Sequence, residues 1–246
     1  LDSAGGFWYF VRKNRPFAGD GERWMQKPGR DRVAGLVVLA GLPLACSPVA
    51  LAQGDPLEQP FPATLELGDL DGEIGFRLDG AADGDVSGDS VASVGDINGD
   101  GIADLVIGAP GQSSGGVAAA GTTFIVFGSD SGFPAEFRLR DLDGQKGFRI
   151  DGVERPGASG TSVAPAGDVN GDGIADVIIG ASLSEPLRRV QAGSSYVVFG
   201  RDVPGGDRFP AVLDLDELDG EIGFRMDGAE GDFSGGSVAP AGDLND

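Results

Sequence analysis

The stretch DINGDGIAD at residues 96–104, followed at once by the apolar run LVIGAP at residues 105–110, decides the fold of this chain. Oxygen-bearing side chains stand at loop positions 1, 3, 5 and 9, and glycines stand at positions 4 and 6. A hard cation such as Ca²⁺ takes about six to eight oxygen ligands, which alternating Asp and Asn can supply. The glycines permit the sharp turn that brings the carboxylates together. The stretch therefore predicts a calcium-binding loop that leads into a β-strand.

The same loop recurs further along the chain. The stretch DVNGDGIAD occupies residues 168–176 and runs into VIIGAS, and a third copy begins as DLND at residues 243–246. Gly, Asn and Asp also favour ordinary tight turns, but copies in a fixed register indicate a repeated structural unit. The predicted ligands are the oxygen-bearing side chains and the backbone carbonyl at position 7. They are Asp96, Asn98, Asp100, Ile102, Asp104, Asp168, Asn170, Asp172, Ile174, Asp176, Asp243 and Asn245.

Two other readings of the loop are disfavoured. An EF-hand needs a bidentate Glu at position 12, where Ile107 and Ile179 stand, and it is flanked by helices. Mg²⁺ is disfavoured because a flexible loop with several carboxylates suits the larger Ca²⁺. Ca²⁺ is therefore the cofactor that we expect.

A longer pattern repeats with the loop. The segments FPATLELGDLDGEIGFRLDG, FPAEFRLRDLDGQKGFRIDG and FPAVLDLDELDGEIGFRMDG begin at residues 61, 133 and 209, which lie 72 and 76 residues apart. A fixed period of this length indicates a repeat architecture. We expect repeats at residues 61–132, 133–208 and 209–246, the last one truncated, after a linker at residues 53–60.

Each repeat has the pattern of β-structure. In the first repeat, short apolar or alternating runs at residues 75–79, 90–94, 105–107 and 122–127 are bounded by Gly, Asp, Asn or Pro. Four short strands in a unit of this length predict an all-β fold built from the four-stranded blades of a β-propeller. Because blades bury their faces against one another, two blades and part of a third do not close a ring. We therefore expect the N-terminal fragment of a longer protein.

The N-terminal region differs from the repeats. Residues 1–24 show no periodicity and stay unassigned, as upstream or disordered sequence. Residues 25–52 begin with Met25 and basic residues, continue as an apolar run too short to span a membrane, and end in Ala-Leu-Ala. This order is typical of a secretory signal peptide, cleaved after Ala52. An uncleaved anchor and a lipoprotein attached through Cys46 are the alternatives, and all three place the protein outside the cytoplasm: secreted, periplasmic or at the cell surface.

The composition excludes several kinds of site. The 246 residues contain no His and one Cys, so His-ligated zinc, Ser-His-Asp triads and Cys-His dyads are excluded. A net charge of −21, with the excess acid after residue 52, argues against nucleic acid or an anionic membrane as partner. We expect no catalysis from this part of the protein.

The motifs resemble a known repeat. SGDSVA at residues 87–92, the loop at 96–104 and LVIGAP at 105–110 are similar to the FG-GAP repeat of the integrin α-chain β-propeller and of its bacterial relatives. The Gly-Ala-Pro half becomes Gly-Ala-Ser at residues 180–182, and Ser-Gly stands where Phe-Gly is expected. The resemblance implies a propeller of about seven blades, with Ca²⁺ in the hairpin between the first two strands of a blade.

The resemblance also implies a function. We expect an extracellular adhesion or interaction module that binds a protein or glycan, with a structural Ca²⁺. The alternative is a propeller attached to a C-terminal hydrolase of the phospholipase-D type, and a third possibility is a purely structural array. The recurring Arg77, Arg149 and Arg225 are expected to pair with acids of a neighbouring blade rather than with a substrate, and the Asp-Leu-Asp-Gly segments are expected to be ordinary turns.

Overall fold

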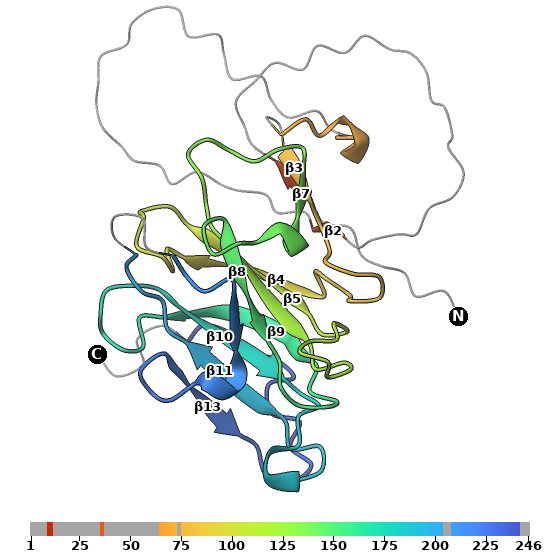
Figure 1. Cartoon of the computed structure of the whole chain (residues 1–246), viewed down its shortest axis with the longest axis vertical. Helices are drawn as coiled ribbons and strands as arrows, with labels where there is room; N and C mark the ends of the chain where they lie inside the picture. Colours follow the sequence, from red (N-terminus) through yellow and green to blue (C-terminus); the bar gives the residue numbers. More distant parts are fainter. Residues whose placement is uncertain (1–8, 12–34, 37–63, 73–74, 204–207, 242–246) are drawn as a thin grey trace, which may run out of the picture.

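The computed structural model describes residues 9–11, 35–36, 64–72, 75–203 and 208–241. Over these residues the chain is all-β, with strands joined by turns and short 3₁₀ helices. Three sheets follow one another along the long axis of the molecule (Figure 1). The architecture is the one expected for adjacent blades of a β-propeller.

The first blade is an antiparallel sheet of four strands. Its order is β4 (Ser90–Gly95), β5 (Asp104–Ala109), β6 (Thr122–Val126) and β8 (Gly147–Asp151). The short strand β12 (Val212–Asp214) pairs in parallel with the outer edge of β8. The first blade therefore takes its fourth strand, β8, and the added strand β12 from the chain that follows β6.

The second blade repeats this arrangement. Its antiparallel order is β9 (Ser159–Gly167), β10 (Asp176–Ala181), β11 (Ser194–Val198) and β13 (Gly223–Asp227). In both blades the first two strands are joined by a predicted calcium loop. The strands expected from the sequence are confirmed, as is the propeller-blade class of fold.

The third sheet surrounds β3 (Gly75–Asp79), which is the counterpart of β8 and β13. The strand pairs in parallel with β7 (Glu136–Arg138) and antiparallel with β1 (Tyr9–Val11) and β2 (Gly35–Leu36). The strands β7 and β12 were not predicted, because three residues are too few to show a period. The 3₁₀ helices are η1 (Leu67–Asp69), η2 (Leu139–Asp141), η3 (Pro186–Arg188) and η5 (Leu215–Glu217).

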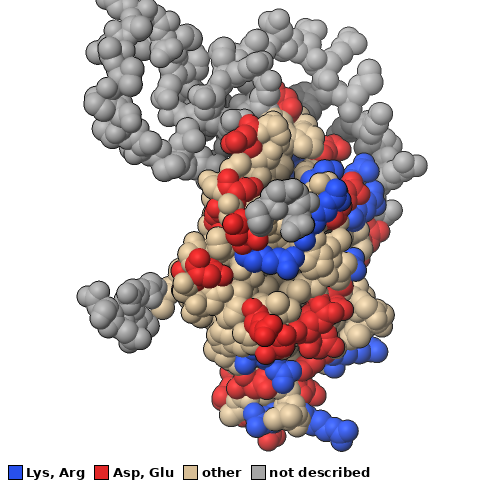
Figure 2. Space-filling model, turned by 60° about the vertical axis from the view of Figure 1, so that its left-hand side comes forward, with Lys and Arg blue, Asp and Glu red and all other residues tan. Residues whose placement is uncertain are grey.

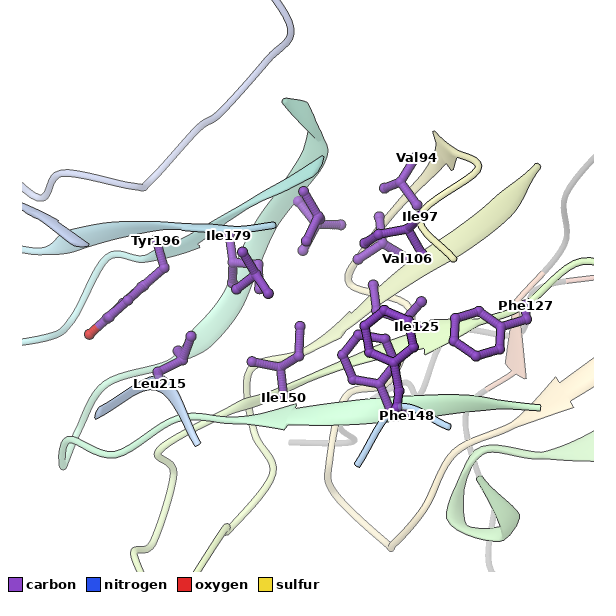
Figure 3. Packing of buried hydrophobic residues seen from close by; sticks show 14 of the residues in the cluster. Val94, Ile97, Val106, Ile125, Phe127, Phe148, Ile150, Ile179, Tyr196 and Leu215 are labelled. Carbon is purple, nitrogen blue, oxygen red and sulfur yellow. The ribbon is translucent and has the colours of Figure 1, made fainter. Parts of the chain in front are cut away.

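The main hydrophobic core lies between the two blades. Val106 and Ile125 of the first blade and Ile179 and Tyr196 of the second belong to this one buried cluster (Figure 3). The opposite face of the first blade packs against the β3 sheet in a second cluster, which includes Phe124. Successive strand residues point to opposite faces, so a strand with both faces covered is buried along its whole length, including any polar residues in it. This explains why every residue of β6 and β11 is buried.

Successive repeats pack closely against two equivalent glycines. A Cβ atom added to Gly108 would lie 2.0 Å from the carbonyl oxygen of Gly160, and one added to Gly180 would lie 1.9 Å from that of Gly235. Any side chain at these positions would push the backbones apart. The invariance of glycine between the two copies of the GAP or GAS motif therefore has a packing reason.

Several predicted features lie outside the described residues. They include the third loop with Asp243 and Asn245, the linker at 53–60, and the signal segment at 25–52 apart from the two residues of β2. Within the part of the chain that the structure describes, no helix has the length and apolar character needed to cross a membrane.

Candidate metal-binding loops

The first loop connects β4 to β5 at one end of the first blade. Its glycines Gly99 and Gly101 have φ values of 76° and 85°, and Gly171 and Gly173 of the second loop have values of 76° and 87°. These left-handed conformations are accessible to glycine without strain. The two loops therefore have the same backbone course, as their matching sequences predict.

The predicted ligands of the first loop organise its backbone. Asp96 accepts the backbone N–H of Asp100 through Oδ1 at 3.0 Å and that of Gly101 through Oδ2 at 2.7 Å. The Asp100 N–H also contacts Oδ1 of Asn98 at 3.0 Å, and Asp100 Oδ1 accepts the Ile102 N–H at 2.8 Å. Each acceptor oxygen keeps lone-pair capacity after these bonds. The side chains are held within the curl of the loop and can still accept further partners.

The second loop repeats this network in its own residues. Its bonds run from Asp172 N to Asp168 Oδ1 and Asn170 Oδ1 at 3.0 Å each, from Gly173 N to Asp168 Oδ2 at 2.9 Å, and from Ile174 N to Asp172 Oδ1 at 2.8 Å. The agreement between two separate stretches of chain shows that the residue pattern itself dictates the geometry. The structure thus joins the predicted side-chain ligands at positions 1, 3 and 5 of each loop in one hydrogen-bond network.

The last aspartate of each loop is buried at the start of a strand. Asp104 is fully buried and accepts the N–H of Ile97 at 2.9 Å and that of Gly128 at 2.7 Å. Burial raises the pKa of Asp104 to about 7; the two hydrogen bonds lower it, and the negative charges of Asp100 and Asp96 raise it further. The loop therefore gathers negative charge that its own residues do not neutralise.

Asp176 has the same surroundings in the second loop. It is fully buried and accepts the N–H of Val169 at 2.7 Å and that of Gly200 at 2.9 Å. Burial again raises the pKa of this carboxyl above its ordinary value. The glycine donors Gly128 and Gly200 were missed in the sequence reading, although their spacing of 72 residues matches that of the aspartates.

The donor set of each loop fits a calcium ion in its chemistry. Three carboxylates, one amide oxygen and one backbone carbonyl are hard ligands of the kind Ca²⁺ prefers. The side chains are not drawn into a ready cluster, because among the described residues no three Asp, Glu, His or Cys side chains are grouped tightly enough to hold a metal. Carboxylates without a counter-charge repel one another. A bound ion would have to draw them inward.

The recurrent arginines have structural partners. Arg77, Arg149 and Arg225 each form an ion pair with the aspartate two residues along the same strand, at 2.6, 3.1 and 2.8 Å. Arg77 also contacts Glu136 at 3.0 Å and Arg225 contacts Glu154 at 3.7 Å, both from another part of the chain. Pairing with acids was predicted correctly, whereas the main partner is on the same strand instead of a neighbouring blade.

The Asp-Leu-Asp-Gly segments are ordinary turns where the structure shows their hydrogen bonds. Asp143 Oδ1 accepts the N–H groups of Gln145 and Lys146 at 3.0 and 3.1 Å, and Asp219 Oδ1 accepts those of Glu221 and Ile222 at 2.8 and 3.2 Å. These bonds lower the pKa of both aspartates. A side chain that bonds to the backbone two residues ahead is characteristic of a turn.

The charged side chains on the surface include groups of both signs. The face in Figure 2 carries several groups of Asp and Glu side chains, with Lys and Arg between them. This distribution agrees with the low sequence pI of about 4.1. An acidic surface attracts cations and repels polyanions.

Comparison with known proteins adds a family likeness. The FG-GAP repeat matches residues 87–126 and 159–198, which contain the first three strands and the candidate metal-binding loop of each blade. Similar curated proteins are phosphatidylinositol-glycan-specific phospholipases D. The bovine protein (Bos taurus) is 37% identical over 101 residues, 41% of this chain and 12% of the relative. The human protein (Homo sapiens) is 32% identical over 109 residues, 44% of this chain and 13% of the relative. The chain therefore matches only a small part of the length of these relatives.

Proposed function

We propose that this chain, which carries two FG-GAP repeats, is a calcium-binding β-propeller module of an extracellular protein and serves adhesion or protein interaction. The observation that carries the proposal is the duplicated loop network, which ends in a buried carboxylate that accepts backbone N–H groups and, within the described residues, forms no ion pair. Burying a carboxylate is costly unless it is paired or coordinates a metal. A calcium ion in each of the two loops would compensate for this cost.

The role of the ion is structural in this proposal. In the first loop the ligands are Asp96, Asn98, Asp100, the carbonyl of Ile102, and Asp104, and the second loop uses the matching residues. When bound, calcium supplies positive charge and coordination to oxygen. The loop residues hold the end of β4 next to the start of β5, and the end of β9 next to the start of β10. A rigid hairpin at this end of each blade then supports the surface that meets a partner.

Thermal unfolding of the chain tests the proposal. We expect the melting temperature to rise between excess chelator and millimolar Ca²⁺, because a ligand that binds only the folded state stabilises it. At a concentration 100 times the dissociation constant, one site contributes about 2.7 kcal/mol. An unchanged melting temperature would exclude a structural ion.

Variants make the test specific to the loops. Asp100→Ala and Asp172→Ala together should remove the response to Ca²⁺, since each removes a central ligand. Asp83→Ala, an exposed aspartate outside both loops, is the control and should retain the full response. Mg²⁺ in place of Ca²⁺ should stabilise the protein less, because it prefers a small octahedral site.

A second candidate function has a specific observation behind it. The similar curated proteins named above are phospholipases D that are specific for phosphatidylinositol-glycan. In this alternative the propeller accompanies a hydrolase domain elsewhere in the same protein, and the repeats themselves bind and do not catalyse. The sequence of the complete gene product distinguishes the two, because a hydrolase needs a catalytic set that these repeats lack.

Export is part of the proposal. A signal peptide at residues 25–52 would deliver the mature chain to the periplasm, the cell surface or the medium, where a protein or glycan partner is bound. Mass spectrometry of the mature protein provides the test: cleavage after Ala52 leaves Gln53 as the first residue, whereas a lipid-modified Cys46 indicates the lipoprotein route. An intact segment would indicate an anchor.

A further inference from the structure

The two candidate calcium loops are directly connected to each other. The backbone N–H of Ala175 donates to the carbonyl oxygen of Asp96 at 3.2 Å. Asp96 is the first predicted ligand of the first loop, and Ala175 stands between Ile174 and Asp176, two predicted ligands of the second. One hydrogen bond therefore joins the ligand-bearing backbone of both loops across the blade boundary.

A second connection runs through residues 200–203, which we call the strap. It begins at Gly200, whose N–H donates to the Asp176 carboxylate. The next donors reach the first loop: Arg201 N–H bonds to the carbonyl of Ile97 at 3.0 Å, and Val203 N–H bonds to that of Asn98 at 3.2 Å. The strap thus links the last ligand of the second loop to the backbone around two ligands of the first.

The strap is closely packed at both of its ends. A Cβ atom on Gly200 would lie 2.2 Å from the Ala175 oxygen and 2.8 Å from the Ile97 oxygen. Further along, Asp202 lies against the first loop, since a Cβ atom on Gly99 would lie 3.1 Å from the Asp202 Cα. Around the matching glycine of the second loop, Gly171, no atom of the described residues lies within 4 Å of that position. The first loop is therefore covered by the next repeat.

We propose that the two loops bind calcium with positive cooperativity, through the Ala175–Asp96 hydrogen bond and the strap. The inference rests on the proposed calcium function and describes how its sites are regulated. Filling the second loop would fix Ile174, Ala175 and Asp176, and with them the N–H groups that hold the first loop. The second ion then binds to a loop that the first ion has already ordered, so it pays less conformational entropy. This is a source of positive coupling.

Thermodynamic reciprocity gives the expected size of the effect. If a filled second loop tightens the first by some factor, a filled first loop tightens the second by the same factor. Couplings of this kind are typically about 5-fold to 150-fold. Adjacent repeats would then become rigid together over a narrow range of calcium concentration.

Calorimetric titration of the full chain with Ca²⁺ tests the coupling. Asp172→Ala leaves the first loop alone, and Asp100→Ala leaves the second alone, so the two variants provide the intrinsic dissociation constants. With these fixed, the wild-type isotherm leaves only the coupling factor to be determined. We expect the factor to be about 5 or more.

A matched pair of glycine variants tests whether the strap carries the effect. Gly99 and Gly171 have the same φ of 76°, so alanine strains both loops equally, but at Gly99 the added Cβ also lies 3.1 Å from the Asp202 Cα, so the strap must shift slightly. Each glycine variant is titrated by itself and again in combination with the aspartate substitution that disables the other loop. The coupling factor should fall towards 1 with Gly99→Ala and remain at the wild-type value with Gly171→Ala.

The outcomes separate the inference from the proposed function. Calcium binding at both loops with a coupling factor of 1 would overturn the cooperativity and leave the calcium function intact. No calcium heat in the wild type would overturn both. An equal loss of coupling in Gly99→Ala and Gly171→Ala would exclude the strap as its carrier.

Discussion

Leu187 occupies the backbone position that Gly115 holds 72 residues earlier, and both residues have a φ of 56°. Arg188 follows with a φ of 61°, where the first blade has Gly116. Glycine adopts this left-handed conformation without strain, whereas a residue with a Cβ atom does not. The Leu187 side chain is 75% exposed, so burial does not offset the cost. At these two positions the connection between the second and third strands is therefore strained in the second blade but not in the first.

Leu187→Asn should stabilise the protein. Asparagine tolerates the left-handed region, so the substitution should raise the free energy of unfolding by about 1 kcal/mol. Urea denaturation measures the change. Leu183→Asn is the control, because Leu183 is also an exposed leucine, at 41%, but is not in the left-handed region. Equal effects of the two substitutions would show that lost surface hydrophobicity, and not strain, is responsible.

Gly108→Ala should destabilise the contact between the blades. The added methyl group would collide with the backbone of Gly160, and overpacking of this kind costs about 3 kcal/mol. Thermal unfolding should show a much lower melting temperature. Gly68→Ala is a suitable control, since the added Cβ has open space and φ is not left-handed there. A Gly108→Ala protein as stable as this control would mean that the blades can slide apart at little cost.

The stability of the protein should decrease in strong alkali because of Tyr196. Burial raises the pKa of Tyr196 to about 12, with Glu154 adding to the rise. Below pH 10 the phenol is neutral in both the folded and the unfolded chain. From pH 10 to 12 only the unfolded chain loses the proton, so the free energy of unfolding falls by about 2.7 kcal/mol in total.

Tyr196→Phe isolates this contribution. Phe124 fills the equivalent place in the first blade, so phenylalanine fits the site. The variant should lack the part of the alkaline loss that Tyr196 causes, and the difference between the two proteins in denaturant titrations at pH 9 and pH 11 measures it. Parallel losses in both proteins would place the tyrosine pKa near its ordinary value.

Two equivalent serines should respond differently to alanine. The hydroxyl of Ser87 donates to the buried carboxylate of Asp85 at 2.9 Å. Its counterpart Ser159 is equally buried, but Gly157 stands in place of the aspartate and the hydroxyl has no hydrogen-bond partner. Chemical denaturation should therefore show a loss of about 1–3 kcal/mol for Ser87→Ala and little loss for Ser159→Ala. Similar losses for both would indicate that Ser159 has a partner such as buried water.

Much of the geometry of the two candidate loops could be predicted because its determinants are local. The residues from Asp96 to Asp104 contain their own turn glycines, acceptors and donors, and the echo at Asp168–Asp176 removes the ambiguity of a single copy. The alternation of apolar residues likewise located the strands of each blade. These features depend on neighbours within one hairpin, which a linear pattern records directly.

The remaining features depend on contacts between repeats. The strap reaches the first loop from about a hundred residues further along the chain, and its donors are backbone N–H groups that no side-chain pattern marks. The parallel strands β7 and β12 exist because β3 and β8 offer them an edge. The nearest partners of Arg149 and Arg225, the aspartates two residues along, were also missed, since an alternating strand puts residues two apart on one face and so within reach.

The exchange of strands between successive repeats bears on how such a chain could have grown. Because β8 and β13 each complete the sheet of the preceding repeat, the unit of sequence and the unit of folding are offset by one strand. A tandem duplication of a 72-residue interval inside the array would supply both a new acceptor edge and the strand that fills it, wherever the breakpoints fall. Gene-level expansion would thus leave every inserted strand with a partner, without selection for a particular recombination point.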